Sequence, residues 1–150
     1  MSDDLVVIDV GKSGSRLRAR IGGRERTSSL GRGISPAEPG DHGDLLGRIV
    51  VELLEDAAIP SGVRGVVVGA TCDLQGGEHL SFESVVRAAA PEAVLVLSDD
   101  GVLAHARAFG ARGGIVLSVG TGVIGVALAP GGLVVRADGW GPLLGDRGSA

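Results

Sequence analysis

The sequence is poor in aromatic residues, in cysteine and in lysine. Its 150 residues include two Phe, one Trp, no Tyr, a single cysteine (Cys72) and a single lysine (Lys12). One cysteine excludes an intrachain disulfide and any zinc or iron–sulfur site built from several thiolates of this chain. The net charge is −4 and the arginines are scattered. A nucleic-acid-binding surface, which needs clustered cations, is therefore not expected.

The chain also shows no targeting or membrane-spanning segment. Its first ten residues, MSDDLVVIDV, carry acidic residues where a secretory signal peptide carries cations. The apolar run within them is too short to cross a bilayer. We therefore expect a cytoplasmic protein without a membrane partner, of the size of one ordinary domain.

Glycine, in contrast, is abundant, and it falls in clusters between runs of Val, Ile and Leu. There are 27 glycines, which favours short strands joined by tight turns. Period-2 alternation indicates strands and 3.6-residue periodicity indicates helices. The predicted elements, in order, are strands 5–10, 15–21 and 24–30, helix 44–58, strand 64–69, helix 81–89, strand 93–98, helix 101–109 and strands 116–119, 124–129 and 133–137.

This order, βββαβαβα followed by further strands, predicts an α/β fold. The first three strands form an antiparallel meander, and the alternating units that follow favour a parallel extension of the same sheet. The last strands begin a second meander. We expect one lobe over residues 1–112 and the start of another over 113–150.

Two glycine-rich motifs superficially suggest nucleotide-binding loops of other folds. Gly11-Lys12-Ser13 lacks the earlier glycine of a P-loop and precedes a strand, whereas a P-loop precedes a helix. The segment 120–125 matches GxGxxG, but alternation continues after it where a dinucleotide site needs a helix. Both are therefore predicted to be hairpins. Glycines and hydroxyls in two such hairpins, each at the start of a meander, suit backbone binding of an anion.

Between the two hairpins stands Ser98-Asp99-Asp100-Gly101, at the end of one predicted strand and the start of a helix. An aspartate there can simply cap the helix, for about 1 kcal/mol. Its neighbour would then project at the carboxyl ends of the strands, where α/β proteins bind ligands.

Together, the segments DVGKSGSR, SDDG, LSVGTG and GWGPLLGDRGSA resemble a known family. They are similar, in this order, to the N-acetylglucosamine kinases and BadF/BadG/BcrA/BcrD-type ATPases of the actin/hexokinase/Hsp70 superfamily. The resemblance covers the whole chain and implies an RNase H-like (actin-like ATPase) lobe followed by the first strands of a second such lobe. It also implies that the adenine-binding part lies beyond Ala150, so we expect the chain alone to be inactive as a kinase.

Carried over position by position, the resemblance implies roles in ATP and sugar binding. Asp9 would act on Mg²⁺ through water, and Asp100 would be the general base that takes the proton of a sugar hydroxyl. The residues expected to hold the phosphates of ATP are Gly11, Lys12, Ser13 and Ser15 in the first loop and Thr121 and Gly122 in the second. The residues expected to contact the sugar are Gly139, Trp140, Gly141 and Asp146.

Three classes of function stay open. The favoured one is ATP-dependent phosphorylation of an amino sugar of the N-acetylglucosamine or glucosamine type, with a homodimer as an open alternative to a monomer. The second is a BadF-type ATPase that drives a partner protein, although the lone Cys72 offers no set of cluster ligands. The third is a catalytically silent sensor, because Arg147 stands where the family has Glu and the chain has no Asn. ADP formation with and without the sugar separates the three classes.

Overall fold

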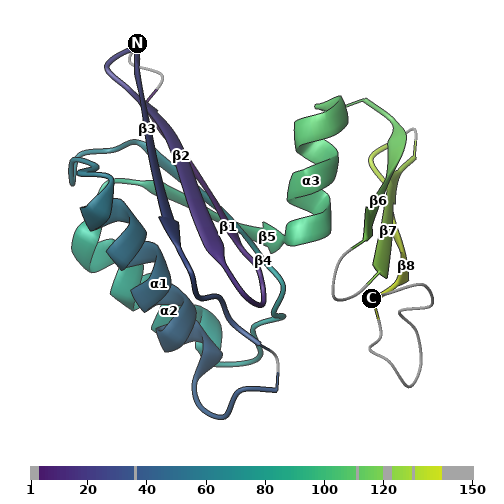
Figure 1. The fold of residues 1–150 in the computed structure, drawn as a ribbon, viewed down its shortest axis with the longest axis horizontal. Helices are drawn as coiled ribbons and strands as arrows, with labels where there is room; N and C mark the ends of the chain where they lie inside the picture. Colours follow the sequence, from purple (N-terminus) through teal and green to yellow (C-terminus); the bar gives the residue numbers. More distant parts are fainter. Residues whose placement is uncertain (1–3, 36, 111, 120–122, 130, 140–150) are drawn as a thin grey trace. The chain divides into compact units, whose positions relative to one another are not determined.

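The computed structural model describes residues 4–35, 37–110, 112–119, 123–129 and 131–139. Contacts divide the chain into two units, Met1–Asp100 and Gly101–Ala150. The elements, labelled in Figure 1, are β1 (Leu5–Val10), β2 (Ser15–Ile21), β3 (Arg24–Leu30), α1 (His42–Asp56), β4 (Gly65–Ala70), α2 (Glu78–Ala89), β5 (Val94–Asp99), α3 (Asp100–Phe109), β6 (Gly114–Val119), β7 (Val123–Leu128) and β8 (Val134–Asp138).

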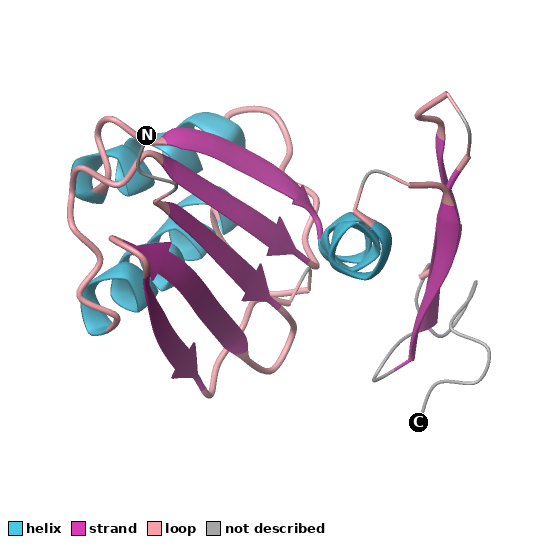
Figure 2. Ribbon diagram, turned by 90° about the horizontal axis from the view of Figure 1, so that it is seen from above, coloured by secondary structure: helices cyan, strands magenta, loops and turns pink. Residues whose placement is uncertain are grey.

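The first unit is built on a mixed five-stranded sheet in the order β3-β2-β1-β4-β5. β1, β2 and β3 pair antiparallel, and β4 and β5 extend the sheet in parallel with β1. Both helices of this unit, α1 and α2, lie on the same face of the sheet (Figure 2). This confirms the predicted antiparallel meander with a parallel extension.

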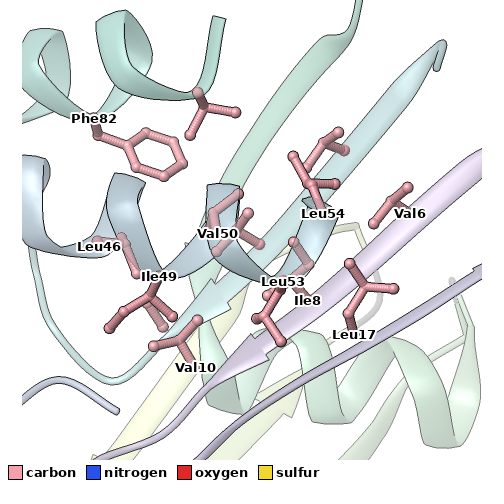
Figure 3. Close-up of a cluster of buried hydrophobic side chains, with 14 of the residues drawn as sticks. Val6, Ile8, Val10, Leu17, Leu46, Ile49, Val50, Leu53, Leu54 and Phe82 are labelled. Atoms are coloured by element: carbon pink, nitrogen blue, oxygen red, sulfur yellow. The ribbon is translucent and has the colours of Figure 1, made fainter. Parts of the chain in front are cut away.

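The core of the first unit lies between this face of the sheet and α1. In β1, Val6, Ile8 and Val10 are fully buried, because alternate residues of a strand point to one face. They meet the apolar stripe of α1, in which Ile49 and Leu53 are also fully buried (Figure 3). Each such side chain contributes about 1.5–3 kcal/mol by its burial. This core holds the strand ends in register.

The opposite face of the same sheet carries the alternate residues of each strand, those that point away from α1 and α2. β2 presents Arg16, Arg18 and Arg20 there, all of them exposed. β5 presents Val94, which is 69% exposed, and Val96, which is 45% exposed. We call this surface the open face, because neither α1 nor α2 covers it (Figure 2).

Glycines allow α1 and α2 to pack closely against each other. A Cβ on Gly43 would lie 1.8 Å from the backbone oxygen of Glu78, and one on Gly47 would lie 2.8 Å from Cβ of Val85. The two helix starts are joined as well: the N-cap Asp41 accepts hydrogen bonds from Asp44 N (3.0 Å) and Ser81 Oγ (2.6 Å). Hydrogen bonds therefore join α1 and α2 at their N-terminal ends.

The second unit contains α3 and the antiparallel sheet β6-β7-β8. Antiparallel pairing of β6 with β7 (Val123–Leu128) confirms that a strand, rather than a helix, follows the first residues of the GxGxxG match. His105 of α3 is buried, and its Nε2 donates to the carbonyl of Gly114 (3.1 Å). A Cβ on Gly114 would lie 2.8 Å from the ring of Phe109. These contacts join α3 to the second sheet. The predicted lobe boundary after residue 112 stays a prediction.

Within the described residues, no helix is long and apolar enough to cross a membrane. The predicted helix 81–89 begins earlier, at Glu78. The reason is local, because the carboxylate of Glu78 accepts a hydrogen bond from Gln75 N (2.7 Å) and stabilises a start that the preceding glycines obscure in the sequence.

Candidate functional site

The candidate site lies in the first unit, at the carboxyl ends of the parallel strands β1, β4 and β5. Asp9 is in register with Gly69, and Gly69 with Ser98, so the three form one row across the sheet. Two strand spacings separate Asp9 from Ser98, or about 10 Å between their Cα atoms. Because parallel strands end at the same edge, residues far apart in the sequence meet at a place where α/β folds bind ligands.

Asp9 is exposed and lies on the open face, between the buried Ile8 and Val10. Among the described residues, none forms an ion pair or a side-chain hydrogen bond with its carboxylate. A carboxylate with open coordination positions suits Mg²⁺, which usually retains several waters and takes one or two carboxylates. The position is therefore compatible with the predicted water-mediated role.

The first predicted phosphate loop, Gly11–Gly14, connects β1 to β2. Gly11 N donates to Gly14 O (2.9 Å), which closes a tight turn. Lys12 and Ser13, at the tip, are exposed, and within the described chain the Lys12 ammonium has no carboxylate partner. The turn thus presents backbone amides, one hydroxyl and one cation beside Asp9, which is a suitable set of groups for a phosphate.

Ser15 lies differently from its neighbours in this loop. It is only 1% exposed, and its Oγ donates to the carbonyl of Arg32 (2.8 Å). In this conformation the hydroxyl supports the loop from the protein side, so a hydrogen bond from it to phosphate would require the hydroxyl to rotate away. The predicted phosphate contact of Ser15 stays a prediction.

The two acidic residues after β5 occupy different positions. Asp99 is the last residue of β5, in register with Ala70, which is buried under the helices. By this register, Asp99 belongs to the face of the sheet that α1 and α2 cover. Ser98, one residue earlier, belongs to the open face, as Asp9 does. Asp100 is the first residue of α3, and both carboxylates are half-buried. Asp100 thus directly follows the end of β5, and the ends of β1, β4 and β5 are in register.

Several predicted site residues lie outside the described residues: Thr121, Gly122, Trp140, Gly141 and Asp146. Gly139 is described and has a φ of +76°, in the left-handed region. Its N donates to the side chain of Asp138 (3.1 Å). This backbone conformation favours glycine, and the predicted sugar contact of Gly139 stays a prediction.

The structure also brings two residues to this edge that the sequence analysis missed. Arg16 lies directly opposite Asp9 in the β1–β2 register and is exposed, so it adds a cationic residue on the neighbouring strand. Thr71 follows β4, and its hydroxyl donates to the carbonyl of Ile34 (3.2 Å). The hairpin register could have identified Arg16. The contact of Thr71 depends on tertiary structure and has no sequence signal.

Cys72 follows Thr71 and is a free, buried cysteine. Burial raises the pKa of its thiol, which keeps it protonated and unsuited to nucleophilic or metal-binding chemistry. Across the described ranges, no group of three or more His, Cys, Asp and Glu side chains could hold a metal ion.

Solved structures similar to this chain share its fold. A proposed N-acetylglucosamine kinase from Chromobacterium violaceum is 28% identical, with a TM-score of 0.70 over 95% of this chain and 51% of that chain. Another, from Porphyromonas gingivalis, is 21% identical, with a TM-score of 0.65 over 97% of this chain and 51% of that one. MamK, as a non-polymerising variant bound to AMPPNP, is 12% identical, with a TM-score of 0.57 over 89% of this chain and 53% of that one.

The chain therefore has the actin-like ATPase fold and is similar to structures of proposed N-acetylglucosamine kinases, as the four motif segments predicted. It spans about half the length of these solved structures. No protein-family model matches the chain, and no curated protein matches it by sequence.

Proposed function

We propose that this chain is the phosphate-binding and general-base part of an ATP-dependent amino-sugar kinase. The observation that carries the proposal is that an exposed carboxylate (Asp9) and a tight glycine turn (Gly11–Gly14) lie at the carboxyl ends of the parallel strands, with a second acidic residue (Asp100) directly after the end of β5. The likeness at 28% identity to a proposed N-acetylglucosamine kinase supports the choice of substrate class.

Phosphoryl transfer needs mainly positioning and neutralisation of charge, rather than covalent chemistry by the protein. Backbone amides of the Gly11–Gly14 turn would orient the phosphates, and the Lys12 ammonium would offset part of their charge. The carboxylate of Asp9 would hold Mg²⁺ through water. The metal, when bound, would supply charge neutralisation at the transferred phosphoryl group.

Asp100 would act as the general base, accepting the proton from the attacking sugar hydroxyl. A positioned base of this kind contributes about 10²–10⁴-fold to the rate. Asp100 is half-buried at the start of α3, which is compatible with this role. Asp99, the last residue of β5, belongs instead to the face of the sheet that the helices cover. Trp140 and Asp146, with Gly139 and Gly141, are proposed to contact an N-acetylglucosamine- or glucosamine-type sugar.

The proposal is tested first by binding, because the chain spans about half of the structures that it resembles. Backbone amide resonances of the purified chain are followed during titration with ATP and Mg²⁺. We expect the largest shifts at Gly11–Ser15, and we expect Asp9→Asn to weaken the Mg²⁺-dependent part of the affinity. Absence of any shift at this loop at millimolar ATP contradicts the proposal.

Titrations with N-acetylglucosamine, with glucosamine and without sugar separate the classes of function. Trp140 is the only tryptophan, so its fluorescence reports on a sugar bound near it without further engineering. A sugar response together with ATP binding favours the kinase. ATP binding with no sugar response favours an ATPase that acts on a partner protein, and absence of both favours a silent sensor.

The role of Asp100 is tested by transfer. Sugar-dependent ADP release is measured for the chain fused, after Ala150, to the second half of the Chromobacterium violaceum protein. If the fusion is active, Asp100→Asn should abolish turnover and leave sugar affinity nearly unchanged, because a general base acts in the transition state. An inactive Asp99→Asn beside an active Asp100→Asn would assign the base to Asp99.

A further inference from the structure

The segment after β3 packs tightly against the Gly11–Gly14 turn, although about twenty residues of the hairpin separate them in the sequence. Ile34 N donates to Gly11 O (2.9 Å), so the turn and the segment share a backbone hydrogen bond. At Gly33 the approach is closer still. A Cβ built there would lie 1.8 Å from Gly11 O and 2.9 Å from the carbonyl carbon of Lys12. Only glycine fits at this position without displacing the turn.

The same segment is fixed on both sides of this contact. On one side, the Oγ of Ser15 donates to the carbonyl of Arg32 (2.8 Å). On the other side, the hydroxyl of Thr71 donates to the carbonyl of Ile34 (3.2 Å). Ile34 itself is fully buried in the core of the first unit. Three successive residues, 32–34, are thus each tied to the region that presents the turn.

Thr71 links this support to the sheet. Its backbone N donates to the carbonyl of Val10 (3.1 Å), which is the last residue of β1. Its side chain reaches Ile34, so a single residue ties the end of β1 and the supporting segment to the end of β4. A displacement of Thr71 would therefore disturb both the end of β1, which precedes the turn, and the segment 32–34, which packs against it.

We propose that Gly33 and Thr71 are positioning residues that hold the Gly11–Gly14 turn in the conformation that binds phosphate. The inference rests on the proposed function and deepens it. A turn with a glycine at each end has many accessible conformations, and a loop that must be ordered on binding loses affinity. Close contact with residues 32–34 orders the turn beforehand. Neither Gly33 nor Thr71 is expected to touch the phosphate.

Two matched pairs of variants test the inference. Gly33→Ala introduces a methyl group into the contact, and Gly31→Ala is its control, because a Cβ on Gly31 meets nothing within 4 Å and its φ is not positive. Thr71→Val keeps the shape of the side chain and removes the hydroxyl. Thr71→Ser retains the hydroxyl and should restore the behaviour of the unmodified chain.

The first measurement needs no ligand. Amide hydrogen exchange is followed at Gly11, whose N–H closes the turn, and at Ile34, whose N–H joins the supporting segment to the turn. We expect exchange at both to accelerate about tenfold or more in Gly33→Ala and Thr71→Val, as expected for local opening. Gly31→Ala and Thr71→Ser should leave it unchanged. A purely structural defect would instead accelerate exchange uniformly along β1 and β4.

The second measurement is titration with ATP and Mg²⁺, with the thermal unfolding midpoint taken for each variant in the same buffer. We expect Kd to rise about tenfold in Gly33→Ala, the loss of roughly one hydrogen bond to a charged group. The inference is overturned if Gly33→Ala and Thr71→Val both bind ATP with the affinity of the unmodified chain. If the unmodified chain does not bind ATP, the proposed function fails. The exchange measurement is independent of that result: unchanged exchange at Gly11 in Gly33→Ala and Thr71→Val shows that these residues do not hold the turn.

Discussion

Strand β1 of the first unit and strand β6 of the second unit differ in how far their apolar side chains are buried. In the first unit, the apolar residues of β1 that face the helices are fully buried, as is Leu53 of α1. In the second unit, Ile115 is 74% exposed, Leu117 66% and Val119 62%, all in β6. Similar apolar residues are therefore buried in β1 and exposed in β6.

The difference follows from what covers each sheet. Two helices that pack closely through Gly43 and Gly47 cover the first sheet, whereas in the described part of the second unit β6 retains an exposed apolar row. Burial, rather than strand propensity, supplies most of the free energy that stabilises a sheet. We therefore expect the stability of the chain to reside in residues 4–100, and the second unit to respond weakly to loss of its exposed side chains.

The largest expected effect comes from a pair of Leu→Ala substitutions, one in each unit. Leu53→Ala should lower the free energy of unfolding by about 2–5 kcal/mol, because it leaves a cavity in a packed core. Leu117→Ala should change it by less than about 1 kcal/mol, since the side chain is already exposed. Urea unfolding followed by circular dichroism measures both. Equal losses would mean that β6 is covered in solution by another molecule or segment.

A second pair of substitutions tests the contact between the two helices. Gly43→Ala should destabilise the chain by about 1–3 kcal/mol, because the new methyl group must displace the backbone of α2 at Glu78. Gly62→Ala is the control, since a Cβ there meets nothing within 4 Å. If both variants unfold at the same urea concentration, the close packing of α1 on α2 does not stabilise the first unit.

Much of the fold was predictable from the sequence, for identifiable physical reasons. The strands 5–10, 15–21 and 24–30 have the bounds that were predicted, because their alternation is regular and glycine turns separate them. Helix α1 was predicted over 44–58 and spans His42–Asp56, because its apolar periodicity marks its length better than its ends. Local patterns of this kind survive in the folded chain whatever its tertiary contacts.

The candidate site was predictable only in part. The segments that carry Asp9, Gly11–Ser13 and Asp100 were found from glycine clusters, acidic pairs and the family resemblance. The inward hydrogen bond of Ser15 and the contact of Gly33 with the turn were not, because both depend on where a distant segment packs. Sequence patterns locate groups on elements, whereas contacts between loops require the three-dimensional structure.

A smaller effect is expected in the local opening of the two sheets. Amides of β1, in the centre of the first sheet, should exchange only when the unit unfolds, whereas those of β6 should exchange through local opening. We expect exchange in β6 to be at least about tenfold faster than in β1, since side chains there are exposed. Equal rates in β1 and β6 would indicate that the two units open together and would break the comparison between them.

The smallest expected effect is a dependence of stability on pH at the joined ends of α1 and α2. The hydrogen bond from Ser81, followed by that from Asp44 N, lowers the pKa of Asp41, and hydrogen bonds from Gln75 N and His42 N lower that of Glu78. A carboxyl group whose pKa is lower in the folded chain stabilises it above the unfolded pKa, and this contribution is lost as the pH falls through the folded value.

The loss should therefore begin as the pH falls through about 4, the ordinary range for Asp and Glu. Ser81→Ala removes the main cause at Asp41, so this variant should be less stable than the unmodified chain at pH 7 and approach it near pH 3. Ser84→Ala, an exposed position of the same helix, is the control. Because these carboxylates are exposed, added salt should reduce the difference. The difference in stability is measured as the difference in thermal unfolding midpoint between Ser81→Ala and the unmodified chain, from pH 3 to pH 7. A difference that stays constant over this range would show that Asp41 is not the group that titrates.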